Sequence, residues 1–135
     1  MPELCERAIV PVEPDRLWRE IGDFGAIDRW HPMLDHVEIE DGGSVRRAHA
    51  ADGSVQVERL LEEGGHAYRY RLEDTPMPIE DYEAELRVED RDDGGSEVVW
   101  WARFELAKEG DDDEAVEGVR GFLRAGLTKL RERFG

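Results

Sequence analysis

Two hydrophobic periodicities follow one another along the chain, and their order is the feature that most limits its fold. Between Leu34 and Phe104, apolar and polar residues alternate with a period of two, in short runs separated by turns rich in Asp and Gly. After Asp113 the period becomes helical and stays so almost to the C-terminus. A period of two predicts half-buried strands, and turns this close together favour an antiparallel meander over parallel crossovers.

The alternation predicts six strands, and an apolar segment near the N-terminus predicts one more. Asp52-Gly53 is a tight hairpin signal between two of them, and Thr75 to Pro78 forms a stiff connecting loop. The expected strands cover residues 4–12, 34–40, 44–50, 55–62, 68–73, 82–89 and 98–104.

Helices are expected at two places. Pro14 opens a short helix that ends at Gly22, and the segment 24–32 allows one or two further turns before Pro32. At the C-terminus, Asp111 to Asp113 offer N-cap oxygens to a helix of about 20 residues, roughly 30 Å long. Its apolar stripe consists of Val116, Val119, Leu123, Gly126, Leu127 and Leu130. Nothing else in the chain can cover the apolar face of the sheet, so this helix must lie across it.

The expected fold class is therefore α+β: a seven-stranded antiparallel curved sheet around a long C-terminal helix, with two short helices between the first and second strands. With 135 residues, the chain is predicted to form a single domain over 1–135.

Charge narrows the range of partners. The formal net charge of −16 repels phosphate backbones and anionic membranes, so neither nucleic acid nor a membrane surface is an expected partner. No apolar run reaches the roughly 20 residues that a membrane span needs, and no signal peptide is visible, so a cytoplasmic location is the default. Lys108 and Lys129 are the only lysines, a bias that suits either a salt-rich cytoplasm or simply an acidic protein. The lone Cys5 allows no intramolecular disulfide.

Five segments resemble the SRPBCC superfamily by their order and spacing. This group includes START-type lipid carriers, the birch-pollen-allergen fold, plant abscisic-acid receptors and polyketide cyclase/dehydrase-like proteins. The segments are FGAIDRWHP (24–32), ERLL (58–61), TPMPIEDYEAEL (75–86), VVWWARFEL (98–106) and GLTKLRERFG (126–135). They are most similar to the bacterial polyketide cyclase/dehydrase-like branch and cover nearly the whole chain. The resemblance implies a helix-grip fold with a ligand cavity between sheet and helix, but no particular reaction.

Whether this cavity is hollow or filled is left open by the residues themselves. Tyr and Trp side chains on the apolar faces need polar partners, which either a wet cavity or ordinary neighbours can supply. Gly126 lies on the core stripe of the last helix, where glycine costs about 1 kcal/mol relative to alanine. The position therefore needs either a close backbone approach or empty space.

Three residues are candidates for proton transfer or carbonyl polarisation: His31, Glu58 and Tyr82. Each also has a simpler structural interpretation. His31 could be an ordinary loop histidine, Glu58 a member of an ion pair at the sheet edge, and Tyr82 a core tyrosine. The alternation does not settle whether Glu58 or Arg59 faces inward; the resembling motif favours Glu58. The full expected ligand-binding set is Trp30, His31, Glu58, Tyr70, Tyr82, Trp100, Phe122 and Gly126.

Other kinds of site lack a sequence signal. The four histidines do not have metal-site spacing, and the P-loop, dinucleotide-binding and G-x-S-x-G motifs are absent, so no metal and no cofactor is expected. The sequence favours a non-catalytic binder or carrier of a small hydrophobic molecule, ahead of a cyclase or dehydratase acting on a polyketide-like substrate. An interaction module with a filled cavity is the third reading. A homodimer is compatible with the sequence but not indicated by it.

Overall fold

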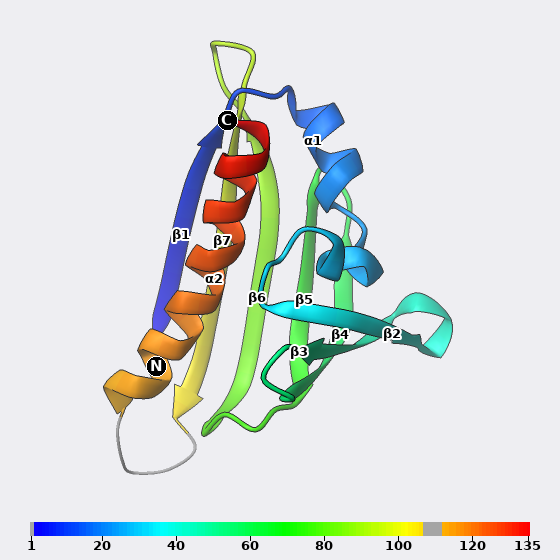
Figure 1. Ribbon diagram of the computed structural model, residues 1–135, viewed down its shortest axis with the longest axis vertical. Coiled ribbons are helices and arrows are strands. Elements are labelled where there is room, and N and C mark those ends of the chain that lie inside the picture. Colours follow the sequence, from blue (N-terminus) through cyan, green and yellow to red (C-terminus); the bar gives the residue numbers. More distant parts are fainter. Residues whose placement is uncertain (1, 107–111) are drawn as a thin grey trace.

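The computed structural model describes residues 2–106 and 112–135, and it contains a seven-stranded, wholly antiparallel sheet in the order β1-β7-β6-β5-β4-β3-β2 (Figure 1). The predicted architecture is confirmed. The elements in chain order are β1 (Glu3–Val10), α1 (Pro14–Ile21), η1 (Phe24–Arg29), β2 (Leu34–Glu40), η2 (Asp41–Gly43), β3 (Val45–Ala50), β4 (Val55–Glu63), β5 (Ala67–Asp74), β6 (Ile79–Asp90), β7 (Ser96–Leu106) and α2 (Asp112–Phe134). The expected cap residue Asp111 lies outside the described residues.

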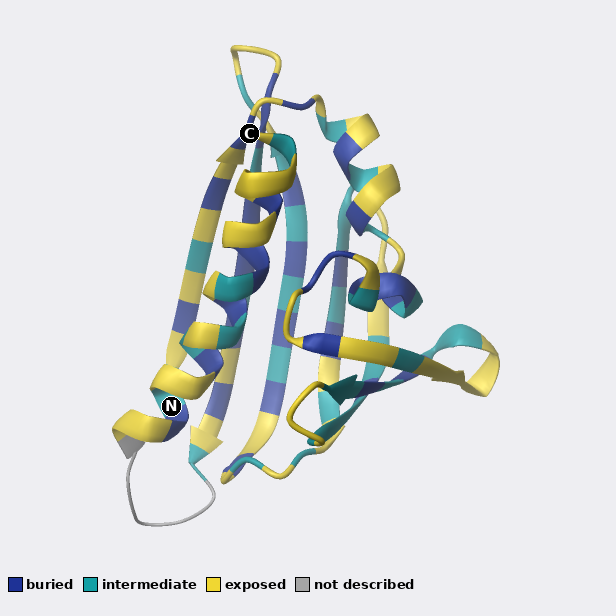
Figure 2. Ribbon diagram, in the orientation of Figure 1, coloured by how far each residue is buried: buried dark blue, intermediate teal, exposed yellow. Residues whose placement is uncertain are grey.

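The period-two pattern has the predicted result in the central strands. Figure 2 shows buried and less buried residues alternating along β6 and β7. The buried members of the alternating set are Tyr82, Ala84, Leu86 and Val88 in β6 and Val98, Trp100, Ala102 and Phe104 in β7, and Val99 between two of them is buried as well. β1 is shorter than expected: it ends at Val10 because Pro11 has no N–H to continue the ladder.

The two short helices form where the chain stops alternating. Pro14 occupies the first helical position of α1, where its missing N–H costs nothing, and the N–H of Gly22 closes the helix on the Trp18 carbonyl at 2.7 Å. The side chain of Asp23 then accepts a hydrogen bond from the Gly25 N–H and starts the 3₁₀ turns of η1. Because η1 packs against β2, it places Phe24 and Ile27 over the concave side of the sheet.

Helix α2 lies in front of β1 and β7, with its buried stripe turned toward the sheet (Figures 1 and 2). Leu123, Leu127 and Leu130 are almost completely buried there. A Cβ atom on Gly126 would come within 2.8 Å of the His31 ring and 2.9 Å of the Trp100 ring. Of the two readings of this glycine, close backbone approach is therefore the one observed.

The sheet is strongly curved, so that β2 runs across the view whereas β6 and β7 run along it (Figure 1). Irregularities interrupt the pairing of β4 with β5 and of β6 with β7, the latter beside Asp81, whose φ is 53°. Such bulges bend and twist strands. As a result, β2, β3 and β4 curl away from the part of the sheet that α2 covers, which leaves room on the concave side. Within the described residues, no helix is long and apolar enough to cross a membrane.

Candidate functional site

A cavity of about 660 Å³ lies between the curled strands, the β5–β6 loop and the first turns of α2. Its walls are mostly apolar, with Leu72 on the sheet side, Val119 and Phe122 on the helix side, and Pro76 to Pro78 at the loop. The lining comprises Pro32, Met33, Leu34, Ala48, Ala50, Ala51, Asp52, Ser54, Gln56, Glu58, Leu72, Pro76, Met77, Pro78, Tyr82, Gly118, Val119 and Phe122.

Two polar side chains in this lining, Glu58 and Tyr82, are themselves buried, being 7% and 6% exposed. Glu58 comes from the middle of β4 and Tyr82 from the start of β6, so they are far apart in sequence and meet only through the fold. The open question of the inward residue is settled in favour of Glu58. Arg59 points to the outer face, where it pairs with Glu73 and with Asp41, the latter at 3.1 Å.

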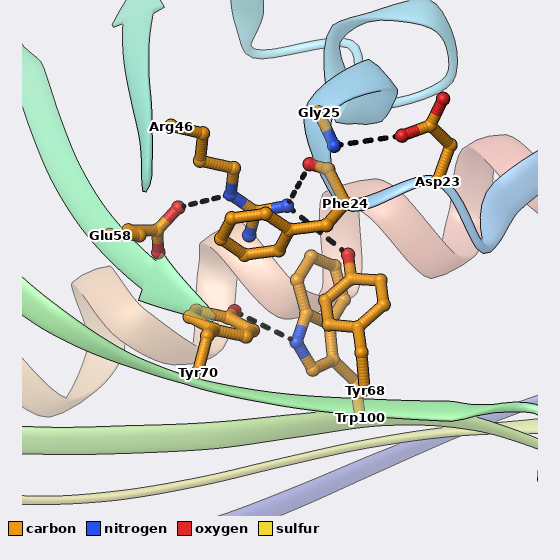
Figure 3. Close-up of polar contacts among 8 residues, drawn as sticks. All are labelled: Asp23, Phe24, Gly25, Arg46, Glu58, Tyr68, Tyr70 and Trp100. Carbon is orange, nitrogen blue, oxygen red and sulfur yellow. Dashed lines mark hydrogen bonds and ion pairs between the residues drawn. The ribbon is translucent and has the colours of Figure 1, made fainter. Parts of the chain in front are cut away.

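Arg46 holds Glu58 in place and is the main residue near the cavity that the sequence analysis missed. It is completely buried, and its Nε donates to Glu58 Oε1 at 2.8 Å (Figure 3). Its Nη1 donates to the Phe24 carbonyl oxygen at 2.7 Å and to the Tyr68 hydroxyl at 3.2 Å. The signal was present in the hairpin around Asp52-Gly53, since Arg46 and Glu58 are direct cross-strand partners.

The guanidinium of Arg46 is also enclosed by aromatic rings. Its central carbon lies 4.1 Å from the centre of the Phe24 ring and 4.7 Å from that of Tyr70, distances at which a cation is attracted to the ring faces. Burial alone lowers the pKa of Arg46, but the attraction of Glu58 and the two tyrosines outweighs this and raises it. Arg46 thus stays charged. Within the described residues its Nη2 finds no hydrogen-bond acceptor, so these ring faces are its remaining stabilisation.

Tyr82 lies beside a hydrogen-bonded pair of aromatic side chains. The indole N–H of Trp100 donates to the Tyr70 hydroxyl at 3.2 Å (Figure 3), and the ring centres of Tyr70 and Tyr82 are 6.4 Å apart. Burial, followed by the charge of Glu58, raises the pKa of Tyr82. Tyr82 therefore remains a neutral phenol, which can donate its proton in a hydrogen bond.

His31 is buried but is not part of the cavity lining. The Met33 N–H donates to its Nδ1 at 3.2 Å, which leaves Nε2 to carry the proton and donate to the Phe122 carbonyl at 2.8 Å. Burial lowers the pKa of His31 to about 4; the hydrogen bond to Phe122 opposes this shift and the charge of Arg46 adds to it. With both nitrogens engaged, His31 fixes the position of α2 rather than offering a proton to the cavity.

Three of the eight predicted ligand-binding residues line the cavity: Glu58, Tyr82 and Phe122. The other five stand behind the walls. Tyr70 lies beside Tyr82 with ring centres 6.4 Å apart, and Trp30 and Trp100 pack against each other with ring centres 5.5 Å apart. Gly126 brings α2 against His31 and Trp100. Their rings and backbone shape the site without forming its surface. The sequence could not predict this, because alternation indicates which face of the sheet a residue occupies but not whether another residue lies between it and the cavity.

These features define a class of protein. A curved antiparallel sheet that grips a long C-terminal helix and leaves a cavity between them is the helix-grip fold of the START and birch-pollen-allergen superfamily. The model of the family described as "Polyketide cyclase / dehydrase and lipid transport" matches residues 1–135, and the chain belongs to this family.

Solved structures are similar over almost the whole chain. XoxI from Bacillus cereus is 27% identical with a TM-score of 0.93, and the alignment covers 99% of this chain and 96% of that one. A protein from Thermobifida fusca is 29% identical with a TM-score of 0.82, covering 100% and 94%. The Zhui aromatase/cyclase from Streptomyces sp. R1128 is 20% identical with a TM-score of 0.78, covering 98% and 92%, and shares the fold. A search of curated proteins finds no match.

Proposed function

We propose that the chain binds a small, mostly apolar molecule in the cavity between the sheet and α2. The observation that carries the proposal is a cavity of about 660 Å³ whose walls are apolar apart from a few side chains. Ligand sites are typically concave, mostly apolar and roughly 300–1,000 Å³ in volume, with a small number of placed polar groups. The family description, which names polyketides and lipid transport, supports the same class of ligand.

The buried polar pair suggests how such a ligand is oriented. Tyr82 has a proton to donate, because burial and the charge of Glu58 raise its pKa and keep it a neutral phenol. Glu58 uses one carboxylate oxygen for Arg46, which leaves the other to accept. A donor and an acceptor in one apolar cavity suit a molecule that carries a carbonyl and a hydroxyl group, as polyketide-like compounds do.

Binding is tested with a pair of glycines on α2. Gly118 lines the cavity and Gly121 does not, and a Cβ added at either meets no atom within 4 Å. We expect the wild-type protein to bind the neutral dye N-phenyl-1-naphthylamine with one-to-one stoichiometry and a blue-shifted emission. Gly118→Trp should weaken this binding by about tenfold or more, because the indole would occupy part of the cavity. A tenfold loss corresponds to ~1.4 kcal/mol. Gly121→Trp should bind like the wild type. Equal binding by the two variants, or none by the wild type, would contradict the proposal.

The role of Tyr82 is tested with a ketone-bearing dye, 6-propionyl-2-dimethylaminonaphthalene, whose emission shifts to the red when its carbonyl accepts a hydrogen bond. Tyr82→Phe removes the donor and keeps the ring, so the emission of the bound ketone should shift to the blue and its affinity should fall by about tenfold. The affinity for N-phenyl-1-naphthylamine, which has no carbonyl, should stay the same. A parallel loss for both dyes would contradict a hydrogen bond from Tyr82 to the ligand carbonyl, because it would mean that the substitution disturbs the cavity for any ligand.

A cyclase activity is the second candidate, favoured by the presence of Glu58 and Tyr82 in one cavity. In an aldol closure, Glu58 would take a proton from the methylene carbon that attacks, and Tyr82 would polarise the carbonyl that is attacked. His31 would not transfer protons, because its nitrogens are engaged by Met33 and Phe122. Incubation with a synthetic poly-β-ketothioester should then yield a cyclised product by mass spectrometry, and Glu58→Gln should abolish it. Product formation at the uncatalysed rate would contradict the cyclase activity and leave ligand binding as the only proposed function.

A further inference from the structure

The hairpin of β2 and β3 carries a second group of chemically active side chains, on the face opposite the cavity. Ala48 and Ala50 of β3 line the cavity, so His49 between them points to the outer face. There His49 is the direct cross-strand partner of His36, and Glu38 is two residues further along β2 on the same face. The ring centres of His36 and His49 are 4.1 Å apart.

These three side chains have the donor atoms and the spacing of a metal site. One ligand atom from each of His36, Glu38 and His49 lies within 4.8 Å of the other two. His49 Nε2 and Glu38 Oε1 are already in hydrogen-bond contact at 2.5 Å. Two imidazole nitrogens and a carboxylate form a typical zinc-ligand set that leaves a fourth coordination position open.

The surroundings favour a cation and allow the adjustment that it requires. The imidazole rings are nearly parallel, at 10°, so their nitrogen lone pairs must rotate to converge on one ion. Solvent exposure permits this, because the side chain of His36 is 55% exposed and that of Glu38 is 56% exposed. Asp35 Oδ2 lies 3.5 Å from His36 Nδ1 and is placed to orient the ring with Nε2 outward, as carboxylates do beside metal-bound histidines.

The charges around these three side chains also favour the binding of a cation. The neighbouring cation Arg47 is paired with Glu40 at 2.9 Å, which offsets its repulsion of an incoming ion. The net charge of −16 attracts cations to the molecule as a whole.

We propose that His36, Glu38 and His49 form a binding site for a divalent transition-metal ion, with Zn²⁺ as the ion that the ligand set fits. The site is independent of the cavity, since it uses the other face of β3. Sequence spacing did not reveal it because the ligands belong to two strands and meet only through the hairpin register.

The test is calorimetric titration of untagged, metal-free protein with ZnCl₂, with CoCl₂ as a spectroscopic probe of coordination. We expect one equivalent of Zn²⁺ per chain and cobalt absorption bands characteristic of nitrogen and oxygen ligands. His36→Ala and His49→Ala should each weaken binding by about 100-fold, since loss of a direct ligand costs at least as much as loss of a group that supports one. The cobalt bands should disappear in both variants.

His66→Ala is the matched control, because His66 is also a partly exposed histidine beside a carboxylate, Asp15, but lies in the β4–β5 turn. It should bind Zn²⁺ like the wild type, as should Cys5→Ser, which removes the exposed thiol. Far-UV circular dichroism without metal checks that each variant is folded. Absence of saturable binding, or equal affinity in the wild type and His49→Ala, would overturn the proposal.

Discussion

At the scale of single residues, the pair Arg46–Glu58 has the largest energetic consequences. Arg46 is completely buried. Its charge is balanced by the Glu58 carboxylate, two further oxygen acceptors and the faces of aromatic rings. Ion pairs of this kind do not stabilise a fold relative to apolar residues of the same shape, but losing one partner is costly. The pair is therefore best understood as a device that fixes the carboxylate at the cavity wall.

This argument predicts an asymmetry between single and double substitution. Glu58→Leu leaves the Arg46 charge buried without its carboxylate, so the free energy of unfolding should fall by about 3–5 kcal/mol. In Arg46→Met/Glu58→Leu, most of this loss should be recovered because no charge remains buried. Urea denaturation followed by fluorescence measures both. A double variant as unstable as Glu58→Leu alone would contradict the interpretation.

His31 predicts a dependence of stability on pH. Its pKa is about 4 in the folded protein against 6.5 as the ordinary value, so the unfolded chain binds the proton more readily. Stability contributed by neutral His31 is fully present above pH 6.5 and is lost as pH falls towards 4, to a total of about 3 kcal/mol. His31→Gln keeps a donor and an acceptor but does not titrate. The difference in unfolding free energy between wild type and variant should therefore shrink over this range. A constant difference would show that His31 titrates normally.

At the scale of elements, α2 carries two glycines with opposite expected responses to alanine. Any helical glycine replaced by alanine gains about 1 kcal/mol of helix stability. At Gly121, where a new Cβ meets nothing within 4 Å, this gain should appear in full. At Gly126 the Cβ would contact the rings of His31 and Trp100, and overpacking of about 1–3 kcal/mol should make the substitution destabilising. Thermal unfolding should raise the midpoint of Gly121→Ala and lower that of Gly126→Ala. The same sign for both would contradict the close approach of α2.

The sequence was most informative about the positions of the helices and strands. Alternation located six of the strands because burial on one face acts on every second residue. An apolar segment near the N-terminus located β1, and the stripe on α2 followed from a helical period. Depth behind the cavity wall was not predictable in this way: Tyr70 and Tyr82 share a pattern, yet only Tyr82 reaches the cavity. Arg46 was missed because a charged residue in a short strand looks exposed unless its cross-strand partner is considered. His36 and His49 escaped for the same reason.

At the scale of the whole molecule, charge should govern the response to salt. The net charge of −16 makes the folded state repel itself, while ion pairs between exposed side chains contribute little each. Raising NaCl from 0.01 M to 0.2 M shortens the screening length from about 30 Å to under 10 Å. The unfolding midpoint should rise by about 5 °C. NaCl and Na₂SO₄ at equal ionic strength should act alike in this range, which separates screening from surface exclusion. A midpoint that falls with salt would mean that the surface ion pairs dominate.

The alanines along one wall of the cavity have a consequence for its size. Ala48, Ala50 and Ala51 come from β3 and the turn after it, opposite the helix, and the space beside them exists because their side chains end at a methyl group. Larger residues at these positions would fill part of this space. Under the proposed binding function, such substitutions would shorten the molecule that fits, whereas Glu58 and Tyr82 would still determine which polar groups it carries.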